Sequence, residues 1–131
     1  MPAPSISFEF FPPKSLDASF KLWETLHALH YLEPSFVSVT YGAGGATRQL
    51  THEAVEAIRH HTDIDVAAHL TCVEAARAET LEIAERYADA GVTRIVALRG
   101  DPPAGSDGFE PHRYGFANSV ELVEALASTG K

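Results

Sequence analysis

The sequence has few of the residues that mark secreted or membrane proteins. Its single cysteine, Cys72, excludes a disulfide within the chain, and one free thiol is typical of a reducing compartment. The first five residues, MPAPS, lack the basic and apolar segments of a signal peptide. Apolar runs as long as a transmembrane helix are also absent. These absences predict a cytoplasmic protein.

Positive charge is scarce as well. Ten lysines and arginines stand against 18 acidic residues, the formal net charge is −8, and the two signs are mixed along the chain. Nucleic acids and anionic membranes are bound by clusters of Lys and Arg, so the sequence predicts neither partner. A few local cations would still suffice for an anionic small molecule. The 131 residues, 45% of them hydrophobic, predict one domain that spans residues 1–131.

What the sequence does contain is a repeated strand–helix unit. The predicted strands are Ile6–Phe11, Phe36–Tyr41, Val66–Thr71 and Arg94–Arg99. The predicted helices are Ser15–Tyr31, Arg48–His61, a third that begins between Thr71 and Ala78 and ends before Gly91, and a fourth from Asn118 or Ser119 to Ser128. The repeat length of roughly 30 residues is that of one βα unit. Such alternation predicts a parallel sheet with right-handed crossovers.

Apolar residues at helical spacing indicate which helix faces enter the core. The predicted inward residues are Leu16, Phe20, Trp23 and Leu26 in the first helix, Leu50, Ala54, Val55 and Ile58 in the second, and Val120, Val123 and Leu126 in the fourth. Ser15 is the predicted N-cap of the first helix, and Gly91 is the residue that stops the third. Thr71 with Glu74 fits a capping box for the third helix, unless the preceding loop continues to Ala78.

A doubly wound sheet and a (β/α)8 barrel both contain such repeats, and the strand patterns favour the barrel. One face of each strand is bulky, whereas the other is small and becomes polar towards the C-terminal end. The bulky residues are Ile6, Phe8 and Phe10, then Val37 and Val39, then Val66, Ala68 and Leu70, then Val96 and Leu98. A barrel places helices outside and polar residues at its C-terminal mouth. Since a complete barrel needs about 250 residues, the sequence predicts an α/β half barrel of four βα units.

Polar side chains stand at the ends of the four predicted strands. Glu9, Thr40, His69, Arg99 and Asp101 all fall on or just beyond the predicted inward face. Singly, each has an ordinary explanation, such as a surface charge, a core histidine or a loop ion pair. Four strand ends in agreement indicate a site. Because Glu9 stands among phenylalanines, we expect desolvation to disfavour its charged form, as in a general acid.

The segment Tyr41–Thr47 after the second predicted strand is rich in glycine, which lets main-chain N–H groups approach a ligand. It matches neither a dinucleotide fingerprint nor a Walker motif, and a flexible turn explains it equally well.

Four motifs together resemble the methylenetetrahydrofolate reductase family. They are SFEFFPPK at 7–14, VTYGAGG at 39–45, AHLTC at 68–72 and ALRGDPP at 97–103. Their order and spacing are those of the N-terminal half of that family's catalytic barrel. The resemblance implies an oxidoreductase flavoprotein of one-carbon metabolism and methionine biosynthesis. In this family non-covalently bound FAD takes a hydride from NADH or NADPH and passes it to 5,10-methylenetetrahydrofolate, which becomes 5-methyltetrahydrofolate.

The resemblance also implies roles for single residues. Glu9 resembles the general acid that protonates the folate and opens its methylene bridge, and Asp101 resembles the carboxylate that tunes hydride donation near flavin and pterin. Both are therefore candidate catalytic and substrate residues. The positions that match FAD contacts are Thr40, Tyr41, Ala43, His69, Arg99, Gly100, Asp101 and Tyr114. Thr40 resembles the threonine beside the reactive edge of the flavin, and Arg99 supplies fixed positive charge. The predicted site contains no metal.

The later strands of the family barrel have no counterpart in this sequence. A half barrel exposes two strand edges and its inner face, so we expect self-association, as a homodimer that closes a (β/α)8-like ring or as a higher homo-oligomer. One alternative is pairing with a missing C-terminal half, and another is a compact flavodoxin-like sheet. Two alternatives concern function: a truncated or engineered scaffold that folds and dimerises without catalysis, and a module that keeps part of a flavin pocket.

Overall fold

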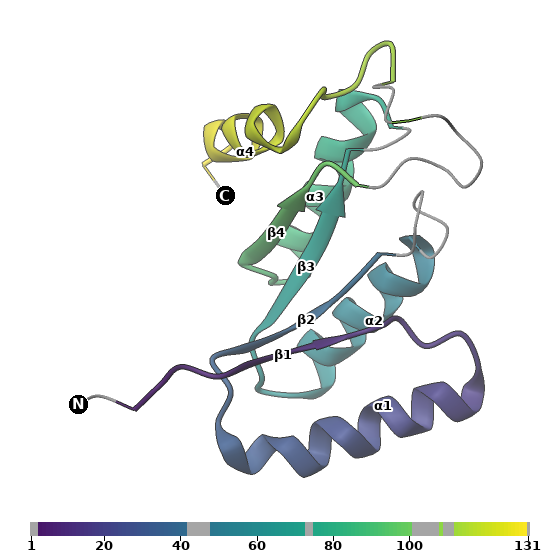
Figure 1. Cartoon of the computed structure of the whole chain (residues 1–131), viewed down its shortest axis with the longest axis vertical. Coiled ribbons are helices and arrows are strands. Elements are labelled where there is room, and N and C mark those ends of the chain that lie inside the picture. Colours follow the sequence, from purple (N-terminus) through teal and green to yellow (C-terminus); the bar gives the residue numbers. More distant parts are fainter. Residues whose placement is uncertain (1–2, 42–47, 73–74, 101–107, 109–111, 131) are drawn as a thin grey trace.

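The structure, a computed structural model, describes residues 3–41, 48–72, 75–100, 108 and 112–130. Within them, four strands alternate with helices (Figure 1). The strands are β1 (Ser7–Phe10), β2 (Phe36–Val39), β3 (Val66–Thr71) and β4 (Arg94–Leu98). The helices are α1 (Leu16–Leu29), with the 3-10 helix η1 (His30–Leu32) behind it, α2 (Arg48–His61), α3 (Arg77–Asp89) and α4 (Ser119–Ser128). The predicted elements are confirmed, with small differences at their ends.

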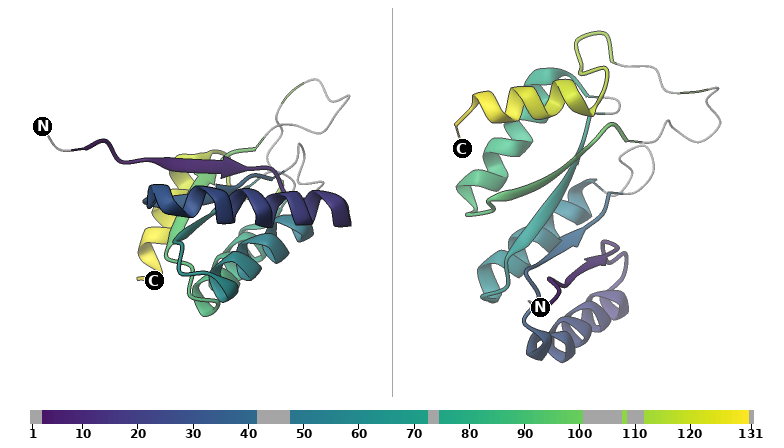
Figure 2. Two further views of the ribbon diagram at one scale, coloured as in Figure 1. Left: turned by 90° about the horizontal axis from the view of Figure 1, so that it is seen from below. Right: turned by 60° about the vertical axis from the view of Figure 1, so that its left-hand side comes forward.

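The strands form one parallel sheet in the order β1-β2-β3-β4. A doubly wound sheet reverses its strand order at a switch point, and this sheet does not, so the flavodoxin-like alternative is wrong. Right-handed crossovers that all run in one direction place their helices on the same face. Figures 1 and 2 show α1, α2 and α3 along that outer side as the sheet curves from β1 to β4. The half-barrel prediction is confirmed.

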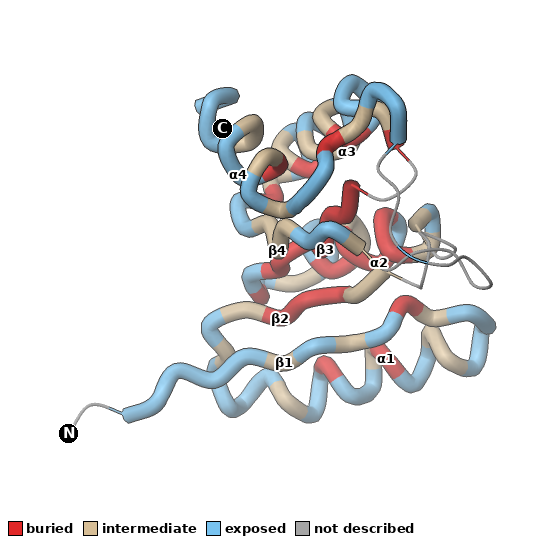
Figure 3. The backbone as a smooth tube through the Cα atoms, turned by 45° about the horizontal axis from the view of Figure 1, so that its top comes forward, coloured by how far each residue is buried: buried red, intermediate tan, exposed pale blue. Residues whose placement is uncertain are grey.

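The core lies between the sheet and the helices on its outer side. One buried cluster joins β2 and β3 to α1, α2 and α3, and its main members are Leu22, Leu26, Val37, Val39, Val55, Ile58, Val66 and Tyr87. A second cluster of Leu70, Cys72, Phe116 and Leu122 joins β3 to α4 and its preceding loop. Figure 3 shows β2 and β3 as the buried strands, whereas β1 is half-buried or exposed. Each fully buried Leu, Ile or Phe contributes about 1.5–3 kcal/mol, so these clusters hold the helices on the sheet.

The inward faces predicted for α1 and α4 are right only in part: Leu26 is buried, and Trp23 and Leu126 pack against the core. The buried leucines are Leu22 and Leu26 in α1 and Leu122 in α4. The exposed residues are Leu16, Phe20, Val120 and Val123. Both helices carry apolar residues on more than one stripe, and the stripe with the larger leucine content packs on the sheet. Spacing alone does not identify that stripe, so the inward orientation predicted for these four exposed residues was wrong.

Strand β4 faces the opposite way from the prediction. Its register pairs Leu70 with Ala97 and His69 with Val96. Residues paired in register share a face of the sheet, so Ala97 faces the helices, whereas Val96 and Leu98 lie on the inner face. The strand is a continuous apolar run after its first residue, and such a run carries no alternation from which to assign its two faces.

The predicted caps are confirmed except at the start of α3. Oγ of Ser15 accepts a hydrogen bond of 3.1 Å from a main-chain N–H in the first turn of α1. Gly91 follows α3 with φ of +90°, a left-handed conformation that costs glycine little. Helix α3 begins at Arg77, and Thr71 is the last residue of β3, so the capping-box interpretation of Thr71 was wrong.

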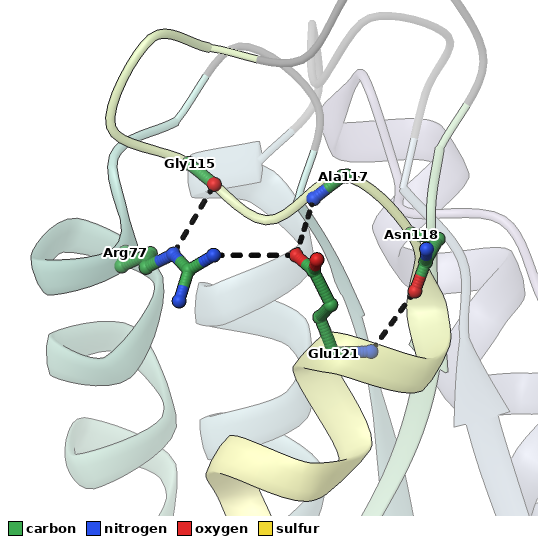
Figure 4. A network of polar contacts seen from close by, with 5 residues as sticks. All are labelled: Arg77, Gly115, Ala117, Asn118 and Glu121. Atoms are coloured by element: carbon green, nitrogen blue, oxygen red, sulfur yellow. Dashed lines mark hydrogen bonds and ion pairs between the residues drawn. The ribbon is translucent and has the colours of Figure 1, made fainter.

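The start of α4 is tied to α3 by a polar cluster, drawn in Figure 4. Oδ1 of Asn118 caps α4 by accepting from the N–H of Glu121 at 3.0 Å. Oε2 of Glu121 accepts from the N–H of Ala117 at 2.8 Å and from Nη2 of Arg77 at 3.3 Å. Nε of Arg77 also donates to the carbonyl of Gly115 at 3.2 Å. The Glu121 carboxylate is therefore the junction between the two helices.

We expect Glu121→Ala to lower the free energy of unfolding by about 1–2 kcal/mol, since it removes an acceptor at the helix start and an ion pair. Glu121→Gln keeps the acceptor for Ala117 and should lose less than half as much. Glu124→Ala, an exposed change on the same helix, is the matched control and should stay near zero. Urea denaturation followed by circular dichroism measures all three, and equal losses for Glu121→Ala and Glu124→Ala would contradict this account.

Candidate active site

The inner face of the sheet, opposite the helices, carries the candidate site. The register places Glu9 of β1 beside Ser38 of β2, and Ser38 beside Ala67 of β3. His69 and Thr71 follow Ala67 on the same face because side chains alternate along a strand. All strands run in one direction, so these polar groups gather at the C-terminal edge, where barrel active sites lie. The predicted meeting of Glu9 and His69 on one face is confirmed.

Glu9 and His69 form the central contact of this face. Nε2 of His69 lies 3.1 Å from Oε1 of Glu9, and Oγ of Ser38 lies 3.5 Å from the same oxygen. Burial lowers the pKa of His69, while the charge of Glu9 acts in the opposite direction. A carboxyl group and an imidazole at this distance can exchange a proton. Among the described residues Nε2 of His69 has no aligned hydrogen bond, so one of the two side chains must rotate before the pair can share a proton.

Glu9 itself is more open than expected. Its side chain is 62% exposed. Phe8 and Phe10 pack against the helix-side core, because alternation along β1 directs them to the other face. They therefore do not surround the carboxyl group, and the prediction that Glu9 is desolvated within this chain was wrong.

Two threonine hydroxyls mark the C-terminal edge of the inner face. Within the described residues, Oγ1 of Thr40 and Oγ1 of Thr71 are buried without a hydrogen-bond partner. Thr40 continues the alternation of Ser38, and Thr71 that of His69. A buried hydroxyl without a partner is unfavourable by about 1–3 kcal/mol, so such groups indicate a place for a polar ligand. Thr71 was missed as a site residue because its sequence pattern fits a helix cap.

Tyr41 leaves β2 towards the helices rather than towards the inner face. Its hydroxyl lies 2.9 Å from Nε2 of His52 in α2, and burial raises the pKa of the phenol. The ring is thus engaged behind the sheet. A contact between Tyr41 and FAD stays a prediction.

Three further predicted positions lie apart from the Glu9–His69 pair. Arg99 is exposed, and its Nε donates to the carbonyl of Gly100 at 3.4 Å. Because β4 ends at Leu98, strand alternation does not fix the side of the sheet on which Arg99 lies, and its place on the inner face stays a prediction. Tyr114 is exposed, and its carbonyl accepts from the N–H of Arg77 at 2.8 Å, at the start of α3. The FAD contacts of Arg99, Gly100 and Tyr114 stay predictions.

Ala43 and Asp101, together with most of the glycine-rich segment, lie outside the described residues. Across the described residues, His, Cys, Asp and Glu side chains nowhere form a group of three that could hold a metal ion. None of the helices in this described part has the length and apolar character needed to cross a bilayer.

Comparison with known proteins identifies relatives of the chain. The family model described as methylenetetrahydrofolate reductase matches residues 2–131. The 5,10-methylenetetrahydrofolate reductase of Escherichia coli (strain K12) is 42% identical over 123 residues, which are 94% of this chain and 40% of that protein. The enzyme of the same name from Buchnera aphidicola subsp. Schizaphis graminum is 50% identical over 121 residues, 92% of this chain and 40% of that protein. Methylenetetrahydrofolate reductase (NADH) 1 of Arabidopsis thaliana is 36% identical over 124 residues, 95% of this chain and 21% of that protein. The chain thus spans about 40% of the length of its bacterial relatives.

The Glu9–His69 contact yields a prediction that is independent of any ligand. Glu9→Gln removes the negative charge that opposes the effect of burial, so the pKa of His69 should fall further below its ordinary value. A proton NMR titration of the His69 ring measures the change. Glu24→Gln, an exposed substitution in α1, should leave the titration unaltered. An unchanged or higher titration midpoint of His69 in the Glu9→Gln variant would show that the two groups are not coupled.

Proposed function

This chain belongs to the methylenetetrahydrofolate reductase family, and from that premise we propose that its inner sheet face is half of a catalytic surface for folate reduction. The reaction converts 5,10-methylenetetrahydrofolate to 5-methyltetrahydrofolate with NADH or NADPH as the hydride source. The observation that carries the proposal is the contact of 3.1 Å between Glu9 and His69 at the C-terminal edge of the strands. The name of the Arabidopsis relative, which includes NADH, supports a nicotinamide donor.

In this proposal Glu9 delivers the proton that opens the methylene bridge of the folate. One of its oxygens is held between Nε2 of His69 and the hydroxyl of Ser38, at 3.1 and 3.5 Å. Because burial lowers the pKa of His69, the imidazole is neutral near neutral pH and can donate to or accept from the carboxyl group. The proton then passes between groups already in contact, once one of the two side chains has rotated. Since Glu9 is open to solvent in this chain, a covering layer must supply the desolvation that favours a protonated carboxyl group.

The same edge fits FAD as the cofactor. Thr40 and Thr71 offer buried hydroxyls without partners in the described part of the chain, and His69 lies on the same face. These three side chains, with the main chain at Tyr41, would hold the cofactor. When bound, FAD supplies the hydride transfer between the nicotinamide donor and the folate. Asp101 is proposed to tune that transfer, on the basis of its motif alone.

Removal of the Thr71 hydroxyl separates a role in ligand binding from a role in folding. We expect Thr71→Val to weaken FAD binding by about tenfold while leaving the unliganded chain as stable as the parent, or more stable, because the lost hydroxyl had no partner. Flavin absorption and fluorescence titrations measure binding, and thermal unfolding measures stability. Thr93→Val, an exposed change before β4, is the control. A parent chain that takes up no FAD contradicts the proposal that this chain holds the cofactor.

We also propose that a second copy of the chain completes the surface. In the described sheet β1 and β4 are the edge strands, and the inner face has no helix over it. Apolar side chains stand open along these borders, with Ile6 39%, Leu98 38% and Phe11 84% exposed. Two such sheets supply the eight strands of a closed barrel, with β4 of each copy beside β1 of the other. That closure would remove both free edges and cover Glu9.

Sedimentation equilibrium at micromolar concentration tests this association. We expect a dimer, and we expect Leu98→Asp, on the inner face of β4, to shift the mass towards the monomer because it places a charge in the new interface. Leu16→Asp, on the exposed side of α1, is the matched control and should leave the mass unchanged. A parent chain that sediments as a monomer rules out the second copy.

A further inference from the structure

On the helix side of the sheet, two polar side chains of α2 form hydrogen bonds with the two residues that directly follow β2. Thr51 and His52, which are 0% and 4% exposed, lie in the first turns of α2. Oγ1 of Thr51 donates to the carbonyl of Thr40 at 2.7 Å. Nε2 of His52 lies 2.9 Å from the hydroxyl of Tyr41. We call Thr51 and His52 the β2 latch, because two consecutive residues of α2 bind two consecutive residues at the end of β2.

His52 is enclosed by aromatic and charged groups. Its ring meets the ring of Tyr87 edge-on, with centroids 5.2 Å apart, and Tyr87 is fully buried. Burial lowers the pKa of His52 to about 4, and the positive charges of Arg86 and Arg48 act in the same direction. The imidazole is therefore neutral at physiological pH and offers one donor and one acceptor. Either tautomer can bind the Tyr41 hydroxyl.

Packing alone does not account for these two residues. Val55 and Ile58 continue the same buried stripe of α2, and both are apolar. A histidine and a threonine in such positions are unfavourable unless their polar atoms are bonded. Here Oγ1 of Thr51 bonds the main chain of Thr40 and Nε2 of His52 bonds the hydroxyl of Tyr41, while Nδ1 of His52 is buried without a partner among the described residues.

We propose that Thr51 and His52 are positioning residues of the FAD site. They hold Thr40 so that its hydroxyl stays on the inner face, and they retain the Tyr41 ring behind the sheet. The hydroxyl of Tyr41 is then an anchor and does not touch the cofactor. This inference rests on the proposed function and adds to it the residues that orient the β2 side of the site.

Three single variants of the full chain, and the double variant His52→Leu/Tyr41→Phe, test the latch. His52→Leu and Tyr41→Phe each remove the hydrogen bond between the Tyr41 hydroxyl and Nε2 of His52, whereas His52→Gln keeps an amide that can reach the hydroxyl. His60→Leu, an exposed change on the same helix, is the control. The first measurement is amide hydrogen exchange without FAD, read at Thr40, whose N–H donates to the carbonyl of Phe10 at 2.9 Å. The second measurement is the FAD dissociation constant.

We expect faster exchange at Thr40 in His52→Leu and Tyr41→Phe, with exchange in β4 unchanged. The FAD dissociation constants of these two variants should rise about tenfold. The double variant should have a dissociation constant no larger than that of the weaker-binding single variant, since both substitutions remove the same contact. His52→Gln should restore values near those of the parent. A merely structural role would instead lower protection throughout the sheet, with no recovery specific to glutamine.

Two results overturn the inference. One is FAD binding at parental affinity in His52→Leu and Tyr41→Phe. The other is an additive loss in the double variant, which would make the Tyr41 hydroxyl a ligand of the cofactor. If the parent binds no FAD, the proposed function of this chain fails separately. In that case exchange at Thr40 decides the latch, and unchanged protection in both variants overturns it.

Discussion

The in-register pairing of β1, β2 and β3 is the constraint on which the candidate site depends. Glu9 and His69 stand on strands separated by β2, and two strand spacings amount to about 10 Å. Their side chains can meet only because both are long, both point to the inner face, and Ser38 between them is short. A slip of one residue in either pairing would turn Glu9 or His69 to the helices and place a phenylalanine of β1, or an alanine or leucine of β3, on the inner face.

Because side chains alternate along each strand, one face of the sheet packs against the helices and the other carries the candidate site. The outer face is apolar and holds α1, α2 and α3, so the positions of the strand ends are set by core packing. The inner face carries hydroxyl, carboxyl and imidazole groups that the described chain leaves partly unbonded. The β2 latch is the exception on the outer side. There, the buried side chains of Thr51 and His52 form hydrogen bonds with Thr40 and Tyr41, at the end of β2 that borders the site.

Much of this arrangement was predictable from local patterns. Strand and helix boundaries, the Ser15 cap and the Gly91 stop follow from rules that involve a few neighbouring residues. The orientation of β4 was not predictable, since a run of apolar residues has no polar face, and tertiary pairing with β3 decides it. The exposure of Glu9 depends on what covers the sheet, which lies beyond any window of sequence. Thr51 did leave a signal: it stands at helical spacing with Val55 and Ile58, but a polar residue on an apolar stripe is easily passed over.

The sequential strand order has a consequence for how the chain acquires its fold. Each strand pairs with the strand that precedes it in the chain, across a single helix, so paired residues stand 27 or 29 positions apart. Parallel pairing across such a separation is slow, but the sequential order lets each unit add to a sheet already formed while the chain is still being synthesised. The β2-α2-β3 segment, which holds the most buried strands, is suited to be the nucleus. In the proposed ring, β4 of one copy pairs with β1 of the other. These are the last and first strands of the sheet, so their pairing would be the last to form.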